Sequence, residues 1–363
     1  MIYMYLKSWK KRECSGCTAC MNICPKNAIQ MIEDEEGFKY PRINKKECID
    51  CGACYKICPN IKKNKLNTII EAYGVKHKND EERLTSRSGG VFIALSDYIL
   101  NQGGIIYGAR LNEDFTVSHN RAENKEQRDE FKGSKYIQSD MNDIIKKVIQ
   151  DLKNDKKVLF SGTACQVHAI KVSVPEKYNQ NLYTVDLICH GVPSKKIFKD
   201  FLKYIEKISG KTIKEFNFRD KRFGWRSHYE TSIFQDGTEL TTQYFRNLFY
   251  GHNILRPACH ICNYANIHRP ADITIADFWG IENVAPEFQD KKGVSLTIIN
   301  NEKGKRWFES VKDELYTVYC SVEDCIKNTY TLNQPTPESE NRGEFWQDYK
   351  NEKFDYIIEK YGK

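Results

Sequence analysis

The sequence predicts an α/β protein in which a mixed-sheet body follows a small cysteine-rich module. Two cysteine runs near the N-terminus share one spacing, and the polar stretch KKNKLN (62–67) that follows them is a plausible linker. Beyond that stretch, apolar runs of strand length alternate with amphipathic helical segments. At 363 residues, the chain is expected to form two or three domains.

The cysteine runs are CSGCTACMNICP, which begins at Cys14, and CIDCGACYKICP, which begins at Cys48. Both read C-x2-C-x2-C-x3-C-P, the two-cluster ferredoxin spacing in which the fourth cysteine of each run binds the other run's cluster. The spacing predicts one 4Fe-4S cluster on Cys14, Cys17, Cys20 and Cys58, and a second on Cys48, Cys51, Cys54 and Cys24. Structural zinc is disfavoured because zinc sites are four-coordinate, and a pair of them rarely has eight cysteine ligands at this spacing.

The charge of the chain does not indicate a nucleic-acid partner. The formal net charge is +7, but each oxidised 4Fe-4S cluster with its thiolates carries roughly −2, so three clusters leave about +1. The lysines are dispersed, without an aromatic-interleaved basic stripe. Residues 1–66 alone hold 13 Lys and Arg against 7 Asp and Glu, which predicts a face that docks an acidic electron carrier.

No apolar run reaches membrane-span length, and the N-terminal MIYMYLKSWKKREC is too short in apolar residues for a signal peptide. A cytoplasmic location is therefore expected, where regularly spaced cysteines indicate metal rather than disulfides.

The body is expected to begin with a helix from about Ser88, capped by Ser88 and ended by Gly103 or Gly104. Further helices are expected from near Asp140, over 194–210 with Ser194 as cap, and over 303–315. Strands are expected at 105–109, 156–161, 182–189, 272–278 and 294–300. The end, from about Asn333, is rich in Pro, Glu and aromatic residues and is expected to wrap the body.

Junctions between strands and helices are where α/β proteins place ligands. Three such segments are candidate ligand sites: Ser88-Gly89-Gly90 and Ser161-Gly162-Thr163, which suit phosphate, and Gly133-Ser134-Lys135-Tyr136, which offers a small turn, a cation and an aromatic face. None is specific alone, because an SGG sequence is often only a helix cap. Neither a Walker A loop nor G-x-G-x-x-G is present in the sequence.

Taken in order, six segments resemble the coenzyme F-420 hydrogenase/dehydrogenase beta-subunit family. They are RSGGVFIAL, KGSKYIQS, LFSGTACQVHAIK, LICHGVPS, FNFRDKRFGW and CHICNYANIHRPADITIADFWG, and the resemblance spans roughly residues 70–320. It implies FAD and iron–sulfur clusters, and electron exchange of a flavin with deazaflavin, ferredoxin or an organic substrate. It also implies a flavin-binding surface, formed by Ser88, Gly89, Gly90, Ser134, Lys135, Tyr136, Gly162 and Thr163.

The expected organisation is a 2×4Fe-4S ferredoxin-type domain (1–66), a flavin-binding part (67–153), a catalytic part (154–332) and a C-terminal tail (333–363).

A third cluster is expected on Cys165, Cys189, Cys259 and Cys262, which lie in the matching segments and could converge on one sheet edge beside the flavin. Two alternatives stay open. Cys165 and Cys189 could be buried apolar cysteines, and Cys259 and Cys262 could bind zinc with His260 or His268. Cys320 and Cys325 match no motif.

His190 is the candidate proton donor beside the flavin, against a structural role in its turn. Arg219, Asp220 and Lys221 are candidates for binding an anionic substrate or stabilising reduced flavin, or else form a surface salt-bridge group. For Asp272, Asp277 and Trp279, packing and catalysis both stay open. A nucleophilic Cys165–His168 pair is disfavoured because its spacing is common by chance.

The main hypothesis is an iron–sulfur flavoprotein oxidoreductase that passes electrons between ferredoxin, or deazaflavin, and a small organic substrate. The alternative is an electron-transfer subunit of a larger hydrogenase or dehydrogenase with no substrate of its own. A homo-oligomer stays open, and neither a nucleic-acid partner nor a membrane span is expected.

Overall fold

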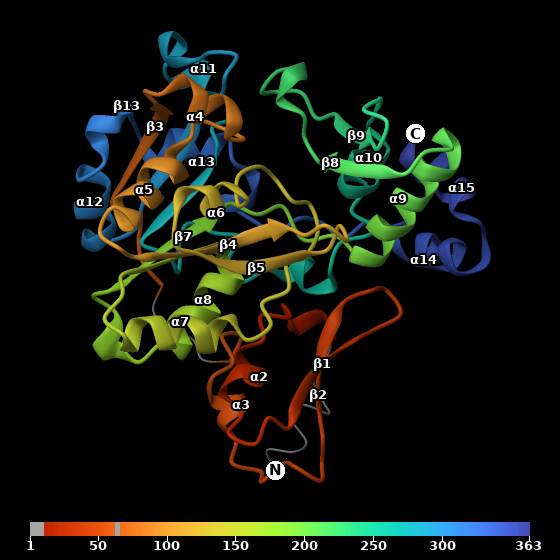
Figure 1. The fold of residues 1–363 in the computed structure, drawn as a ribbon, viewed down its shortest axis with the longest axis horizontal. Coiled ribbons are helices and arrows are strands. Elements are labelled where there is room, and N and C mark those ends of the chain that lie inside the picture. Colours follow the sequence, from red (N-terminus) through yellow and green to blue (C-terminus); the bar gives the residue numbers. More distant parts are fainter. Residues whose placement is uncertain (1–10, 62–65) are drawn as a thin grey trace.

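The computed structural model describes residues 11–61 and 66–363. The first ten residues, which hold most of the N-terminal stretch compared above with a signal peptide, and most of the 62–67 linker lie outside the described residues. Figure 1 shows the N-terminal module as a separate lobe below a large sheet with helices on both faces, and a smaller helix-and-sheet unit beside that sheet. The predicted α/β architecture is confirmed.

The module has the repeated local structure that its sequence repeat predicts. It consists of α2 (Ala19–Ile23), β1 (Ile29–Glu33), β2 (Lys39–Ile43) and α3 (Ala53–Lys56), with β1 and β2 antiparallel. Gly16 and Thr18 have positive φ in the first cysteine loop, and Asp50 and Gly52, each 34 residues later, have positive φ in the second. The two loops therefore share one backbone path.

The body is built on an eight-stranded mixed sheet with the order β13-β3-β12-β11-β7-β6-β4-β5. The strands β4, β6, β7 and β11 are mutually parallel, and the remaining pairs are antiparallel. Their bounds are β3 Glu71–His77, β4 Ile105–Leu111, β5 Val117–Ala122, β6 Val158–Thr163, β7 Leu182–Leu187, β11 Ile273–Asp277, β12 Ser295–Ile299 and β13 Leu315–Cys320. Since residues 71–122 and 158–320 contribute neighbouring strands, the predicted boundary at 153/154 falls within one sheet.

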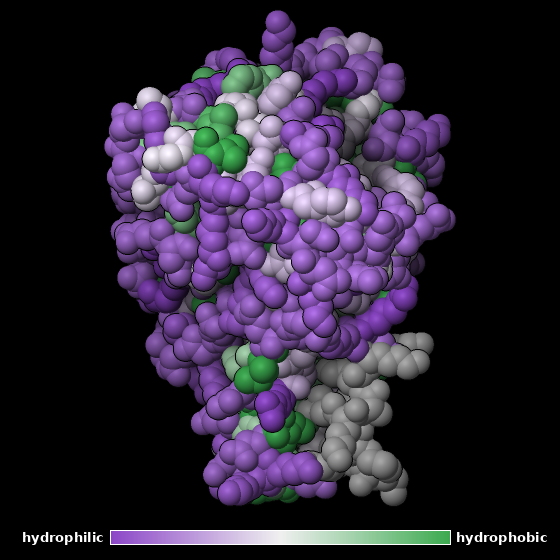
Figure 2. Space-filling model, turned by 90° about the vertical axis from the view of Figure 1, so that its right-hand side faces the viewer, coloured by the Kyte–Doolittle hydropathy of each residue, from purple (hydrophilic) through white to green (hydrophobic). Residues whose placement is uncertain are grey.

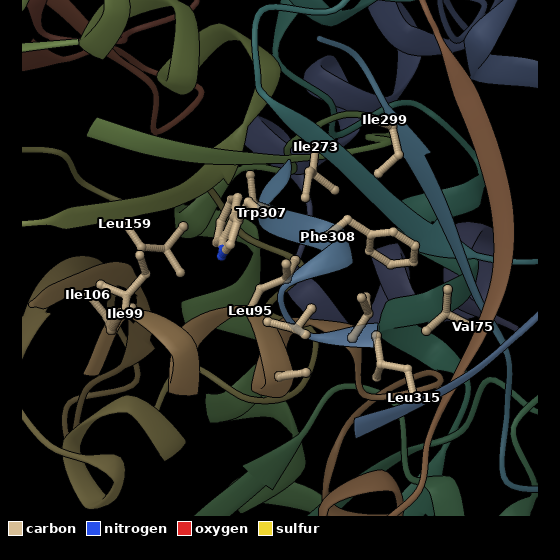
Figure 3. Packing of buried hydrophobic residues seen from close by; sticks show 14 of the residues in the cluster. Val75, Leu95, Ile99, Ile106, Leu159, Ile273, Ile299, Trp307, Phe308 and Leu315 are labelled. Carbon is tan, nitrogen blue, oxygen red and sulfur yellow. The ribbon is translucent and has the colours of Figure 1, made fainter. Parts of the chain in front are cut away.

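Helices cover both faces of this sheet. On one face, α5 (Val91–Leu100) and α12 (Glu302–Glu309) bury Leu95, Trp307 and Phe308 against strand residues (Figure 3). On the other face, α7 (Ile144–Lys153) and α8 (Ala164–Ser173) pack their apolar sides on β4 and β6. Shorter helices are α4 (Asp80–Thr85), α6 (Lys125–Asp129), α11 (Ile281–Val284) and α13 (Val322–Lys327).

The smaller unit is a three-stranded antiparallel sheet with helices around it. It contains β8 (Ile213–Asn217), β9 (Glu230–Phe234), β10 (Glu239–Thr242), α9 (Lys195–Ser209), α10 (Tyr244–Tyr250), α14 (Arg342–Asn351) and α15 (Phe354–Ile357). Phe345, Ile357 and Ile358 of the C-terminal tail are buried in its aromatic-rich core, so the tail completes this unit.

Irregular short turns complete the chain: η1 Lys11–Glu13, η2 Glu176–Tyr178, η3 Lys221–Phe223, η4 Pro257–Ile261, η5 Pro286–Phe288, η6 Lys312–Glu314, η7 Tyr330–Leu332 and η8 Ile358–Gly362.

The expected helix over 194–210 is confirmed with its caps: the Ser194 side chain accepts a hydrogen bond from the Ile197 amide, and Gly210 ends the helix at φ 68°. The expected cap at Ser88 is wrong. Helix α5 begins at Val91 after Gly90, which has φ 86°, because the Ser88 hydroxyl donates to the Val294 carbonyl. The Ser88 side chain therefore binds the segment just before β12 and does not cap the helix.

Candidate functional site

The first module site is formed by Cys14, Cys17, Cys20 and Cys58, the set that the spacing predicts. Cys14, Cys20 and Cys58 are buried. Burial raises the pKa of Cys17 to about 12, and the neighbouring charges of Cys14 and Cys58 act in the same direction. Thiols that raise one another's pKa need a cation between them to ionise together, which is what cluster iron supplies.

The second module site is formed by Cys24, Cys48, Cys51 and Cys54, which line one small cavity with Pro25 and Ile49. This is the predicted set, including Cys24 from the other run. Cys51 is exposed and the other three are half-buried, so this site lies nearer to solvent than the first. Ile49 beside it is 58% exposed.

The remaining candidate ligands come together at the sheet edge where the parallel strands end. Cys165 lies in the first turn of α8, Cys189 follows β7, and Cys259 and Cys262 lie in and just after η4. All four line a single cavity of about 240 Å³, together with module residues that include Ser15 and Asn60. The cavity therefore lies between the body and the first cysteine loop.

The electrostatics of this cavity match those of the first module site. Burial raises the pKa of Cys189 to about 12 and of Cys262 to about 11, and the Cys165 charge raises both. The pKa of Cys259 is raised well above its usual range by burial and by the Cys189 and Cys262 charges. Backbone amides of Val192 and Tyr264 donate to the sulfurs of Cys259 and Cys262 at 3.4 Å, as cluster-binding thiolates accept them.

The geometry of the cavity bears on the choice between a cube and the zinc alternative. Within residues 11–61 and 66–363, no three His, Cys, Asp or Glu side chains converge closely enough for a single ion. His260 Nδ1 contacts the Thr336 carbonyl at 3.1 Å, while its Nε2 is buried without a hydrogen-bond partner, and His268 is exposed. Thiolates around a four-iron cube stand further apart than the ligands of one ion, so four cysteines around a 240 Å³ cavity suit the cube.

The first module site is close to both of the other cysteine sets. The Cys54 charge raises the pKa of Cys58, and the Cys165 charge raises the pKa of Cys17, so each set is close enough to influence the next. Tyr264 lines the cavity, and burial raises its pKa, with the charges of cysteines from both sets (Cys165, Cys17, Cys262 and Cys58) acting in the same direction. Its hydroxyl contacts His168 Nδ1 at 2.8 Å, which gives His168 a partner other than Cys165.

Most of the predicted flavin surface lies along the same sheet edge. The Ser88–Gly90 loop lies at β3 and β12, and Gly162 and Thr163 end β6, which is three strand steps from β12 and four from β3, or about 14–19 Å away. Gly89 is packed tightly, since its amide donates to the Ser295 hydroxyl and an added Cβ would lie 2.0 Å from the Val75 carbonyl oxygen. Thr163 caps α8 with Gln166 and lines the four-cysteine cavity.

The segment at 133–136 offers more accessible groups. Nothing lies within 4 Å of an added Cβ at Gly133, and Ser134 is half-buried. Burial lowers the pKa of Lys135 to about 7, and its Nζ donates to the carbonyls of Glu130 and Lys132. Tyr136 packs against His228 and Phe249 of the smaller unit.

His190 lines the four-cysteine cavity, and its Nε2 lies 2.9 Å from Nε2 of His252. Burial lowers the pKa of His190 to about 4. The ring also contacts Phe249 and Tyr250. His190 is therefore a half-buried neutral imidazole with a histidine partner, which the sequence did not indicate because His252 is 62 residues away.

The Arg219–Lys221 segment is held by protein partners. Arg219 pairs with Asp277 and stacks over Trp279, and Asp220 accepts from Arg222. Lys221 Nζ donates to the carbonyls of Arg83, Ser86 and Ser88, and burial lowers its pKa to about 7. Asp272 accepts from the amide and hydroxyl of Thr184 and has a packing role.

Sequence reasoning missed Arg87. Its guanidinium donates to the carbonyls of Arg219 and Trp225, while its Nε is buried without a hydrogen-bond partner. Among the described residues, no carboxylate lies within 4 Å of Arg87, Lys135 or Lys221. Three cations without a paired carboxylate thus lie near one sheet edge, and only a fold that brings distant segments together could reveal them.

Comparison with known proteins assigns both parts of the chain. Residues 13–60 match the 4Fe-4S dicluster domain, and residues 155–324 match the C terminus of the coenzyme F420 hydrogenase/dehydrogenase beta subunit. The body carries this family's C-terminal domain. That domain holds Cys165, Cys189, Cys259 and Cys262, and the dicluster domain holds the other eight predicted ligands. Residues 13–60 and 155–324 are therefore similar to an iron–sulfur dicluster domain and to the C-terminal part of a beta subunit, respectively.

A solved structure of the F420-reducing [NiFe] hydrogenase complex from Methanosarcina barkeri contains a chain with a similar fold. The two chains are 18% identical with a TM-score of 0.50, over 71% of this chain and 84% of that one. No curated protein matches the chain. No helix in residues 11–61 or 66–363 combines the length and apolar content that a membrane span requires.

Proposed function

We propose that this chain is an electron-transferring beta-type subunit. It carries single electrons between a port, meaning the surface of the module where an electron carrier docks, and a flavin at the sheet edge. The observation that supports it is the four-cysteine cavity, which adjoins the first module site through Cys17, Cys165 and Tyr264. Iron–sulfur cubes supply one-electron transfer when bound, and the chain provides twelve thiols in three sets of four to hold them.

The port is proposed at the second module site. Cys51 is its exposed ligand, and Ile49 adds apolar surface beside it. The exposed cations around this loop are Lys26, Arg42, Lys45, Lys46 and Lys56, against the exposed acids Glu47 and Asp50. In Figure 2 apolar atoms are visible on the module at the narrow end of the molecule, within a mostly hydrophilic surface. An acidic carrier such as ferredoxin fits this charge pattern.

Ionic strength tests the port. We expect the rate of electron transfer from a small acidic ferredoxin to fall steeply with salt, and to fall further in a Lys26→Glu/Lys56→Glu double variant. A Lys350→Glu/Lys353→Glu variant makes the same change of charge at exposed positions of the C-terminal tail and is expected to leave the rate nearly unchanged. A rate that is insensitive to salt would rule out this docking face.

FAD is proposed along the sheet edge between the Ser88–Gly90 loop and Thr163. Arg87, Lys135 and Lys221 lack paired carboxylates there, and the buried Arg87 Nε lacks an acceptor, so an anionic nucleotide fits the donor set. The exposed side chain of Leu187 lies at the end of β7 and offers apolar surface to a ring, and Trp279, which stacks on Trp225, lies just after β11. Lys135→Met is expected to lower bound FAD, whereas Lys125→Met, at an exposed ion pair, is expected to retain it.

The experiment that tests the whole proposal is anaerobic purification followed by iron, sulfide and flavin analysis. Three cubes give about 12 iron atoms per chain, and Cys189→Ser is expected to leave about 8. About 8 iron atoms in the unaltered chain would refute the third cube, and colourless material would refute the proposal.

A reductase with its own small organic substrate is the second candidate, because the ferredoxin-type module is present in the same chain. The two candidates differ in one assay. A beta-type subunit oxidises reduced ferredoxin only when a partner subunit is added, whereas a complete reductase turns over with a small substrate alone.

A further inference from the structure

Arg256 is a buried cation at the junction of the module and the body. It is 1% exposed, and its guanidinium spans three neutral acceptors: Nε donates to the Cys14 carbonyl at 2.6 Å, one terminal nitrogen to Gln138 Oε1 at 2.8 Å, and the other to the Lys39 carbonyl at 2.9 Å. The same group lies over the Tyr40 ring at 4.4 Å.

Its position places it beside two proposed clusters. The Cys14 carbonyl that it binds belongs to a ligand of the first module site, and Gly16 of the same loop is so close that an added Cβ would lie 2.8 Å from the guanidinium. Arg256 also lines the four-cysteine cavity. Burial raises the pKa of Cys165 there, and the Arg256 charge opposes that rise.

The other deeply buried arginines have carboxylate partners. Arg128 pairs with Asp97 and Asp129, and Arg269 pairs with Asp186 at 2.8 Å. Within residues 11–61 and 66–363, no carboxylate lies within 4 Å of Arg256. A buried charge is costly unless an opposite charge is near, so this guanidinium requires a counter-charge that its protein neighbours do not supply.

We propose that Arg256 is a positioning residue that serves as the fixed counter-charge of the first module cluster and the cavity cluster, and so raises the reduction potentials of both. This inference rests on the iron–sulfur content proposed above. A cluster with its thiolates goes from roughly −2 to −3 when it gains one electron, so a neighbouring cation stabilises the reduced form more than the oxidised form. The arginine itself neither gains nor loses charge.

The test is an anaerobic potentiometric titration of the cluster-loaded full chain, with dithionite as reductant and electron paramagnetic resonance as the readout. In Arg256→Met we expect the reduction equilibrium constants of the first module cluster and the cavity cluster to fall about tenfold, which is about 59 mV for a one-electron couple. The second module cluster is the internal reference and is expected to shift by much less, because its ligands lie away from Arg256. Arg306→Met, at an exposed position of α12, controls for the loss of one positive charge.

Two further variants separate electrostatics from docking. Arg256→Lys keeps the positive charge but loses the planar guanidinium that binds three acceptors. The reduction potentials of the two clusters are therefore expected to stay close to those of the unaltered chain. Gln138→Glu keeps the arginine and places a carboxylate on it, so both potentials are expected to fall even if Arg256→Met does not fold.

Equal shifts of the reduction potentials in Arg256→Lys and Arg256→Met would show that Arg256 acts only through its hydrogen bonds and not through its charge, which contradicts the proposal. Unchanged reduction potentials in Gln138→Glu would also overturn it. Iron analysis of each sample distinguishes these outcomes from failure of the proposed function, because an unaltered chain with about 8 iron atoms lacks the cavity cluster altogether.

Discussion

Arg269 and Asp186 form a buried ion pair between β7 and the segment that precedes β11. Asp186 is fully buried and accepts from Arg269 at 2.8 Å and from the Thr274 hydroxyl at 2.7 Å. Arg269→Met leaves Asp186 buried without its cation, which costs about 3–5 kcal/mol. At about 2 °C per kcal/mol, the low end for large domains, the midpoint of anaerobic thermal unfolding is expected to fall by about 6–10 °C.

The same substitution is expected to release the cavity cluster. Arg269 also donates to the carbonyls of Tyr264 and Leu187, which join the segment after Cys262 to the end of β7. Iron content is therefore expected to fall by about four atoms, while the module retains about eight. An Asp186→Leu/Arg269→Met double variant is expected to lose less stability than the sum of the single variants, because no unpaired charge remains. A midpoint within about 2 °C of the unaltered chain, or additive losses, would refute this reasoning.

Three further predictions concern the scaffold. Burial lowers the pKa of His119 from 6.5 to about 4, so folding stability is full above pH 6.5 and falls as pH drops toward 4, by up to about 3 kcal/mol relative to His119→Gln in parallel unfolding titrations. Gly89→Ala is expected to lower the unfolding midpoint more than Gly343→Ala, because an added Cβ meets backbone of β3 and β12 at Gly89 and nothing within 4 Å at Gly343. Ser194→Ala is expected to cost at least about 1 kcal/mol in denaturant unfolding through loss of the α9 cap and of the hydrogen bond that its hydroxyl donates to the Glu36 carbonyl, and Ser209→Ala, near the other end of this helix, is expected to cost less.

The sequence predicted the module because its chemistry is local. Each cysteine loop places three ligands within seven residues, and the fourth cysteine of each run, which binds the other run's cluster, follows at a fixed spacing. Helix α9 was equally predictable, since its Ser194 cap, amphipathic pattern and terminal Gly210 lie within one segment. The four cavity cysteines were expected to converge because they lie in segments that follow or neighbour strand ends, and the family that the body resembles carries these segments together.

The long-range elements were not predictable in this way. Strand β3, EAYGVKH, contains Gly74, Lys76 and His77, and its buried pattern arises from pairing with β12 and β13, more than 200 residues later. The small sheet of β8–β10 has short strands that give weak periodicity. Arg87 and Arg256 became candidates only in the folded structure, because the carbonyls that they bind are distant in the sequence.

The two cysteine loops have the same backbone conformation but different surroundings. This difference indicates which loop exchanges electrons with a carrier and which with the body. In the first loop, Arg256 binds the Cys14 carbonyl and Gln138 donates to the Ser15 carbonyl at 2.9 Å, so the body covers it. In the second loop, the residues at the corresponding positions are Cys48, which is half-buried, and Ile49, which is exposed, and Cys51 two residues later is exposed as well. A symmetric free ferredoxin could exchange electrons through either loop. Among the described residues, the second loop is the more accessible of the two, so exchange with a carrier is expected there and transfer to the body at the first.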